Sequence, residues 1–164
     1  MFKATRELIK ARQPFTKYCV EHVLVSSVYG GKQNACFDNA CNALDRKNGI
    51  RLVSGWLVGK YNQSTLATEI IQHFWNVDKS GRHFDTTPLN SIEFDYVIDC
   101  ELSEFGQKNI DAITSCVSSS LLLKNGKFFA VDSKNGKPMA RIISSLETVN
   151  LFQYEIESDF LLAA

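Results

Sequence analysis

The stretch "NACFDNACNALDRKNGIRLVSGW", residues 34–56, decides the fold of this chain. In its first half Ala40, Ala43 and Leu44 recur at helical intervals, and Asn48-Gly49 ends the pattern as a glycine stop does. The residues that follow, 50–59, alternate and include Val, Leu and Trp, which favours a strand. With the strands that other patterns indicate, this predicts an α+β fold in which a central helix packs on a mostly antiparallel sheet.

The flanking patterns predict the other elements. "TRELIKARQ" favours a short helix that stops before Pro14, because the residue before a proline avoids helical angles. Strands are predicted at 18–28 and 94–100, hairpins at 73–87 around the turn 79–81 and at 127–143 around Asn135-Gly136, and helices at 63–72 and from about Ser103 to residue 123. The tail, 151–164, has no assigned element.

Length and composition restrict the classes of protein. A chain of 164 residues predicts one domain, 1–164, large enough to bury roughly two-thirds of the surface of its unfolded chain without disulfides or metals to stabilise it. Eighteen basic residues balance eighteen acidic ones, so no nucleic-acid partner is expected. No apolar run is long enough to cross a membrane, and no signal peptide is evident. Five cysteines without CxxC spacing then predict a cytoplasmic protein with reduced thiols.

Cys36 is the best-placed of these cysteines to act as a nucleophile. It begins the predicted central helix, where unpaired N–H groups and the helix dipole stabilise a thiolate. Cys41 lies one and a half turns further into the helix, where this effect fades. Cys41, Cys19, Cys100 and Cys116 are therefore expected to be core residues.

His73 and Asp85 lie on the two arms of the predicted hairpin at 73–87. An antiparallel hairpin would bring the two side chains together across the strands. A histidine orientated by a carboxylate can take the proton of a thiol and return it to a leaving group. The sequence thus contains the three parts of a Cys-His-Asp triad: Cys36, His73 and Asp85.

These residues also resemble the signature of the transglutaminase-like superfamily of papain-fold cysteine enzymes. In that family the nucleophilic Cys opens a helix, a Gly-Ile ends it, and the next strand closes in Gly-Tyr or Gly-Trp. A second block then reads His-x-Trp and Asp-x-Thr. The elements in this chain are Cys36, Ala40, Gly49-Ile50, Gly55-Trp56, His73, Trp75, Asp85 and Thr87.

The resemblance covers residues 30–88, within a motif-bearing core of about 18–100, while 89–164 match no motif. The helix is about one turn shorter than is common in the family, and Thr86 stands where the family usually has Pro. The resemblance implies a papain-like fold and acyl transfer through a thioester on Cys36, with His73 as base and then acid and Asp85 fixing its tautomer. Hydrolysis of a peptide, isopeptide or side-chain amide bond in a protein or peptide substrate is expected, without metal or cofactor. Candidates for the oxyanion hole and the substrate cleft are Gln33, Tyr18, Trp56 and Trp75.

Three alternatives stay open at this point. The chain could be an inactive binding or inhibitory module on the same fold, or a protein transglutaminase or deamidase. It could also be a zinc-dependent hydrolase in which His83 joins His73, Asp85 and Cys36 as a ligand, although the spacing of the two histidines matches no usual zinc motif. The sequence carries no signal for an oligomeric state.

Overall fold

The computed structural model describes residues 1–28, 30–45, 51–89, 93–108, 110, 113–116, 120–134, 137–147 and 154–156. Its helices are α1 (Lys3–Arg12), α2 (Cys36–Asp45) and α3 (Cys100–Lys108), and a short 3-10 helix, η1 (Gln13–Phe15), follows α1. Its strands are β1 (Val20–Val23), β2 (Val25–Ser27), β3 (Arg51–Gly59), β4 (Thr68–Val77), β5 (His83–Asp85), β6 (Phe94–Asp99), β7 (Ile113–Cys116), β8 (Ser120–Lys124), β9 (Lys127–Lys134), β10 (Lys137–Ile143) and β11 (Tyr154–Ile156). The α+β class is therefore confirmed.

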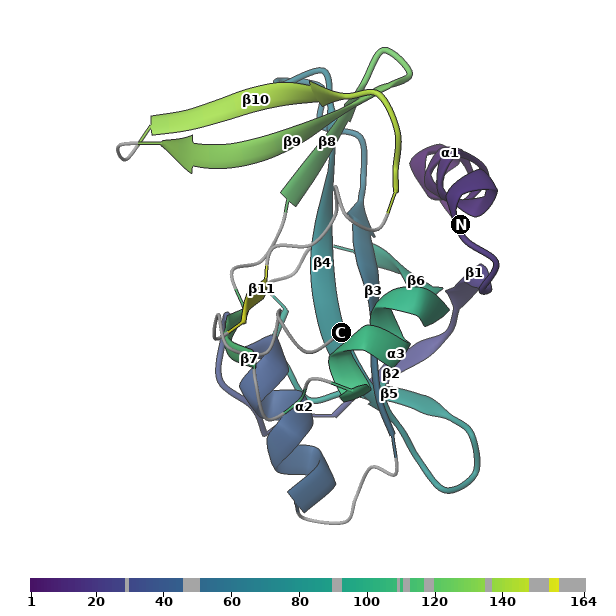
Figure 1. The fold of residues 1–164 in the computed structure, drawn as a ribbon, viewed down its shortest axis with the longest axis vertical. Helices are drawn as coiled ribbons and strands as arrows, with labels where there is room; N and C mark the ends of the chain where they lie inside the picture. Colours follow the sequence, from purple (N-terminus) through teal and green to yellow (C-terminus); the bar gives the residue numbers. More distant parts are fainter. Residues whose placement is uncertain are drawn as a thin grey trace.

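A large sheet organises the described part of the chain (Figure 1). Its strands follow the order β1-β6-β3-β4-β8-β9-β10, and β5 pairs with β4 and β2 with β5. All of these pairs are antiparallel except β2–β5. A separate small sheet joins β11 to β7.

One edge of strand β4 pairs with two different strands, and its other edge pairs with β3. Residues 68–71 pair with β8, and residues 76–77 pair with β5. Between them, residues 72–75 have no ladder partner on this edge within the described part of the chain, while on the other side they pair with β3. His73 lies in this gap, so the sheet opens where the sequence analysis placed the general base.

The helices cover one face of the sheet. Ala4 and Leu8 of α1 and Leu102 of α3 pack in one buried cluster with Trp56. In a second cluster, Phe37 and Ala40 of α2 pack on side chains of β3 and β4. The residues that alternate with these form a third cluster, which contains Val53, Leu57, Trp75, Val77, Tyr96 and Ile98. Among the described residues, no helix is both long and apolar enough to span a membrane.

Gly55 allows the close packing of the central strands. It is in register with His73 of β4 on one side and with Ile98 of β6 on the other. A Cβ atom at this position would overlap the carbonyl oxygen of Val97. Only glycine therefore fits here without moving β6.

Several predicted elements are confirmed. The helix that stops before Pro14, the central helix, the strand that follows it and the strand 94–100 are all present. The chain turns between β4 and β5 as predicted, where the side chain of Asp78 accepts hydrogen bonds from the backbone N–H groups of Ser80 and Arg82. β9 and β10 form the predicted second hairpin, although its turn, Asn135-Gly136, lies outside the described residues.

Three predictions of secondary structure were wrong. The predicted helix at 63–72 is a tight turn followed by the first residues of β4; Asn62 shapes the turn by accepting hydrogen bonds from the N–H groups of Ser64 and Thr65. The helix predicted from about Ser103 begins at Cys100, ends at Lys108, and is followed by β7 and β8. The single strand predicted at 18–28 breaks at the exposed Leu24 into β1 and β2.

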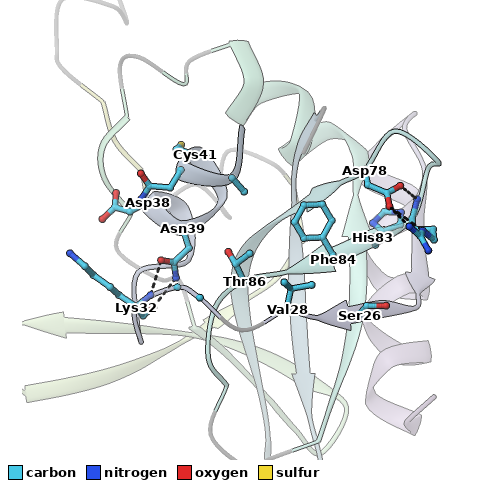
Figure 2. A pocket seen from close by; sticks show the side chains of 15 residues that line it. Ser26, Val28, Lys32, Asp38, Asn39, Cys41, Asp78, His83, Phe84 and Thr86 are labelled. Carbon is cyan, nitrogen blue, oxygen red and sulfur yellow. Dashed lines mark hydrogen bonds and ion pairs between the residues drawn. The ribbon is translucent and has the colours of Figure 1, made fainter. Parts of the chain in front are cut away.

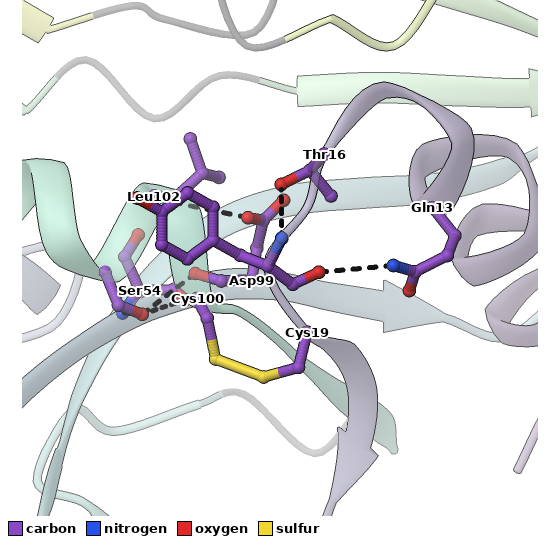
Figure 3. The surroundings of a disulfide bond; sticks show 9 residues. Gln13, Thr16, Cys19, Ser54, Asp99, Cys100 and Leu102 are labelled. Atoms are coloured by element: carbon purple, nitrogen blue, oxygen red, sulfur yellow. Dashed lines mark hydrogen bonds between the residues drawn. A yellow bond between two sulfur atoms is a disulfide. The ribbon is translucent and has the colours of Figure 1, made fainter.

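Cys19 and Cys100 form a disulfide, which contradicts the prediction of five reduced thiols (Figure 3). The antiparallel register pairs Val20 of β1 with Asp99 of β6, so the next residue outward on each strand is a cysteine. The backbone N–H of Cys100 also donates to the carbonyl of Cys19 at 3.0 Å. Cys19 is exposed and Cys100 only half-buried, so neither is the enclosed core residue expected.

Candidate active site

Cys36 is the first residue of α2 and is half-buried. Its side chain packs at the margin of the cluster formed by Phe37, Ala40 and their neighbours on the sheet. The N-terminal end of α2 thus holds the sulfur at the margin of the core, where the helix dipole favours an anion.

Asn39, one turn further along α2, fixes the loop that precedes Cys36. Its side-chain oxygen accepts from the N–H of Lys32 at 2.8 Å, and its amide nitrogen donates to the carbonyl of Lys32 at 2.7 Å. The same nitrogen donates to the hydroxyl of Thr87 at 3.1 Å. Asn39 therefore ties the loop, the helix and the segment after Asp85 into one unit.

Gly31 brings the same loop against the segment after β5. Its N–H donates to the carbonyl of Thr86 at 2.9 Å, and a Cβ atom here would overlap that carbonyl and the side chain of Asn39. Just before it in the chain, the N–H of Val28 donates to the carbonyl of Asp85 at 2.8 Å. The backbone around the predicted carboxylate is thus linked directly to the backbone before the predicted nucleophile.

His73 and Asp85 form a buried pair, as the hairpin predicted. Nε2 of His73 lies 2.6 Å from Oδ2 of Asp85, and the two residues are only 3% and 2% exposed. The ring of His73 also takes part in a side-chain hydrogen bond with Cys36. Because Nε2 faces the carboxylate, Nδ1 is the ring nitrogen that remains for the sulfur. The structure therefore brings the three predicted catalytic residues together in the order Cys36, His73, Asp85.

Two further donors hold the carboxylate of Asp85. The hydroxyl of Tyr96 donates to Oδ2 at 2.8 Å, and the N–H of Thr87 donates to Oδ1 at 2.8 Å. With the His73 ring, these donors satisfy both oxygens of a carboxylate that is shielded from water. Such a set favours the ionised form, because hydrogen bonds to a charged acceptor are the strong ones.

The interactions shift the acid–base behaviour of the pair in opposite directions. Burial of the His73 ring opposes its protonation, but hydrogen bonds to Asp85 and Cys36 and the negative charges of both raise the pKa of His73 to about 9. Burial of Asp85 favours the neutral acid, but the hydrogen bond and positive charge of His73, with the donors of Thr87 and Tyr96, lower the pKa of Asp85. The arrangement thus favours a protonated imidazole beside an ionised Asp85.

Trp75 covers the ring of His73 from the same strand. Its indole lies nearly parallel to the imidazole, at 21° and with 6.3 Å between ring centres, and is fully buried. The indole N–H donates to Nδ1 of His83 at 2.9 Å. Burial and the nearby Arg51 lower the pKa of His83, so this ring is a neutral acceptor at pH 7.

This geometry bears on the zinc alternative. Among the described residues, no group of three or more His, Cys, Asp or Glu side chains is placed to hold a metal ion. His83 faces the indole of Trp75 through Nδ1, as above. The structure does not join it to His73, Asp85 and Cys36 in a ligand set.

The other candidate site residues lie in different places. Gln33 is exposed in the loop before α2, three residues from Cys36. Tyr18 hydrogen-bonds through its hydroxyl to Glu104 of α3, so the structure places it beside that helix. Trp56 is fully buried in the cluster below α1 and α3. Of the four, Trp75 is the one whose ring stacks on that of His73 among the ring contacts of the described residues.

A groove of about 880 Å³ lies between α2 and β5 (Figure 2). Asn39 and Cys41 line it from the helix, and Phe84 and Thr86 line it from β5 and the segment after it. Cys41 is half-buried here, less enclosed than the core position predicted for it. Cys116 falls in β7, but its side chain is outside the described residues.

Tyr96 and Asn39 were not identified as site residues from the sequence. The signal for Tyr96 is a tyrosine within the predicted strand "FDYVID", where a buried hydroxyl needs a partner. The signal for Asn39 is an amide in the first turn of the helix, between Asp38 and Ala40. Neither signal names the partner, because the partners lie on other elements or loops: Asp85 for Tyr96, and Lys32 and Thr87 for Asn39.

No family model, curated protein or solved structure matches this chain. Its function is therefore inferred from its residues and their geometry.

Proposed function

We propose that this protein is a cysteine-dependent acyl-transfer enzyme that hydrolyses a peptide, isopeptide or side-chain amide bond. The observation that supports the proposal is the convergence of Cys36, His73 and Asp85 from three separate elements of the fold, α2, β4 and β5. A purely structural role would not require a half-exposed sulfur, a buried imidazole and a buried carboxylate in series, since buried ionisable groups are costly.

The proposed reaction begins with the thiolate of Cys36 and the protonated ring of His73. The sulfur attacks the carbonyl carbon of the substrate, and the C–N bond breaks as His73 gives its proton to the leaving amine nitrogen. This leaves a thioester on Cys36. The neutral His73 then takes a proton from water, the resulting hydroxide attacks the thioester, and the acid product leaves with the thiolate regenerated.

The surroundings assign a role to each residue of the triad. Asp85 would stabilise the imidazolium and keep Nε2 of His73 engaged, so that Nδ1 faces the sulfur. Trp75 would keep water away from the ring, which strengthens the charges within the site. The N–H of Cys36, at the start of α2, is the backbone donor nearest the attacking sulfur and would be the first candidate for the oxyanion hole.

The proposal also includes four more specific predictions made from the sequence. They are a papain-like version of the α+β fold, membership of the transglutaminase-like superfamily, a protein or peptide substrate and a cytoplasmic location. The disulfide argues against the last of these, since stable disulfides are typical of oxidising compartments. A test by non-reducing mass spectrometry of protein purified from cells would decide which redox state the chain has in them.

The decisive experiment compares the alkylation of two cysteines on the same helix. Iodoacetamide labelling, quantified peptide by peptide between pH 5 and 9, should modify Cys36 at least about tenfold faster than Cys41 below pH 8, because a free thiol is mostly protonated there. His73→Ala should remove this advantage. Cys41 is the internal control, since it is also half-buried and is not part of a disulfide. Equal rates for both cysteines, unchanged by His73→Ala, would favour the inactive binding module.

A second experiment separates hydrolysis from amine transfer. Incubation of the protein with glutamine-containing peptides and a fluorescent primary amine should yield free acid and little amine conjugate. Predominant conjugation would instead favour a transglutaminase. Release of ammonia without peptide cleavage would show that the bond hydrolysed is the side-chain amide, so that the enzyme acts as a deamidase.

A further inference from the structure

Tyr96 reaches the site from a strand that does not adjoin His73. It lies on β6 in register with Leu57 of β3, and β3 separates β6 from β4. Its side chain extends along the sheet surface to Asp85, where the hydroxyl donates to Oδ2 at 2.8 Å. The same oxygen faces Nε2 of His73 at 2.6 Å, so two donors converge on it.

The ring of Tyr96 also contacts the aromatic side chains of β4. It meets His73 edge-on at 6.0 Å between ring centres and 70° between planes, and Trp75 at 5.5 Å and 79°. The residue is 9% exposed. One side chain thus contacts the imidazole through its ring and the carboxylate through its hydroxyl.

We propose that Tyr96 is a positioning residue of the Cys36-His73-Asp85 triad, whose hydroxyl keeps the Asp85 carboxylate ionised and aligned with His73. The catalytic part of this role rests on the proposed function. Its physical basis is that a buried carboxylate loses stability when one of its donors is removed.

The hydroxyl is the part of Tyr96 that packing does not explain. A phenylalanine would keep the ring contacts with His73 and Trp75 and would bury no polar group. The phenol adds a donor aimed at one oxygen of one residue. Burial, the charge of Asp85 and this hydrogen bond all raise the pKa of Tyr96, so the hydroxyl remains a donor at every pH at which the site would work.

Few titratable groups face this carboxylate among the described residues. His73 approaches it from β4 and Tyr96 from β6, and Cys36 of α2 lies beyond the imidazole. A change in the protonation of Asp85 should therefore be visible in the His73 ring.

The test is Tyr96→Phe in the full chain, followed by NMR titration of the His73 ring. In the wild-type protein, protonation of Asp85 at low pH should produce an acid-side inflection in the His73 chemical shifts. In Tyr96→Phe this inflection should move to higher pH by about one unit, because the anion has lost a donor. The acid limb of the Cys36 alkylation rate should move with it.

Tyr18→Phe is the matched control. It removes a hydrogen bond between a tyrosine hydroxyl and a carboxylate on another element, since Tyr18 bonds to Glu104 of α3. It should leave the His73 titration unchanged. A Tyr96→Phe titration that superimposes on that of the wild-type protein, or an equal shift in both variants, would overturn the role of Tyr96.

The two proposals fail in different ways. If the alkylation rate of Cys36 is unchanged in His73→Ala, the proposed enzymatic function is wrong. The NMR titration would still report whether the Tyr96 hydroxyl stabilises the carboxylate of Asp85. If His73→Ala slows alkylation but Tyr96→Phe changes neither the titration nor the acid limb, the triad stands and Tyr96 is only a packing residue.

Discussion

Nε2 of His73 lies 2.6 Å from Oδ2 of Asp85, and both side chains are almost completely buried. The β4–β5 hairpin brings the two strands together, and the bond that joins Gly31 to Thr86 anchors the segment after Asp85. Removal of either partner would leave the other buried without its counter-charge. The pair is therefore expected to control both the stability of the protein and the reactivity of Cys36.

The stability of the protein should fall as the pH rises through about 9. The folded-state pKa of His73, about 9, lies above its ordinary value of 6.5, so the folded protein binds this proton more tightly than the unfolded chain does. The stabilisation is complete below pH 6.5 and is lost as the pH rises through 9. Its size is of the order of 3 kcal/mol, from the difference between the two pKa values.

Urea unfolding at pH 6, 8 and 10 would measure this effect. His73→Gln should remove this contribution to the pH dependence while it lowers stability at pH 6. An NMR titration of the wild-type ring should place its midpoint near pH 9. A midpoint at or below 6.5 would contradict the ion pair.

Asp85→Asn should separate the effect of the Asp85 charge on His73 and Cys36 from the effect of the size and shape of its side chain. The amide is as large as the carboxylate but cannot stabilise an imidazolium, so the pKa of His73 should fall and the ring should be neutral at pH 7. We expect alkylation of Cys36 at pH 6, and any hydrolytic activity, to drop by about 100-fold or more, the lower range for loss of acid–base catalysis.

Asp78→Asn is the matched control for this experiment. Asp78 lies in the turn of the same hairpin and forms an ion pair with Arg82 at 3.0 Å. Its hydrogen bonds with Ser80 and Arg82 lower its pKa, and none of these partners contacts His73. If both variants slowed alkylation equally, the integrity of the hairpin would explain the result, and the charge of Asp85 would not.

The elements that the sequence predicted correctly are those with complete local signals. The helix from Cys36 has Ala and Leu at helical intervals, and the hairpin after it carries Ser80-Gly81 between two alternating runs. Because His73 and Asp85 occupy the arms of that hairpin, their meeting required only one local turn. The proximity of Cys36 required more than local patterns, and there the family resemblance supplied the expectation.

The errors occurred where two structures fit the same local pattern. Ile70 and Ile71 suit the end of a short helix as well as a strand, and pairing with β3 and β8 selects the strand. The run Leu121-Leu122-Leu123 suits the predicted helix, but pairing with β9 makes it a strand with Leu121 and Leu123 buried. Tertiary contacts determine the secondary structure of such segments, and the local propensity of their residues does not.

The contacts between distant residues could not be read from the sequence for a related reason. Tyr96 meets Asp85, and Cys19 meets Cys100, because β6 pairs with both β1 and β3. The sequence predicts β6 as a strand but carries no signal for its neighbours. The disulfide and the positioning tyrosine therefore became visible only with the sheet order.

Asn39→Ala should loosen the loop that precedes Cys36. The substitution removes two hydrogen bonds to Lys32 and one to Thr87, and leaves the N–H of Lys32 without its acceptor. We expect a loss of about 1–3 kcal/mol in the free energy of unfolding, and a several-fold slower alkylation of Cys36. Asn42→Ala, on the exposed side of the same helix, is the control and should change neither quantity. An alkylation rate of Cys36 that is unchanged in Asn39→Ala would show that the loop does not position the sulfur.

Reduction of the Cys19–Cys100 disulfide should destabilise the protein without disabling the site. The bond joins residues 81 positions apart, so it restricts the unfolded chain strongly, and its loss should cost about 2–4 kcal/mol. It also fixes the start of α3, where the hydroxyl of Ser103 donates to the carbonyl of Ser54 on β3. The helix carrying Cys36 has no part in these contacts. The double variant Cys19→Ser with Cys100→Ser should therefore unfold at lower urea concentration yet keep the pH profile of Cys36 alkylation. Dithiothreitol should lower the urea midpoint of the wild-type protein to that of the double variant, and a midpoint unaffected by the reductant would show that the bond contributes no stability.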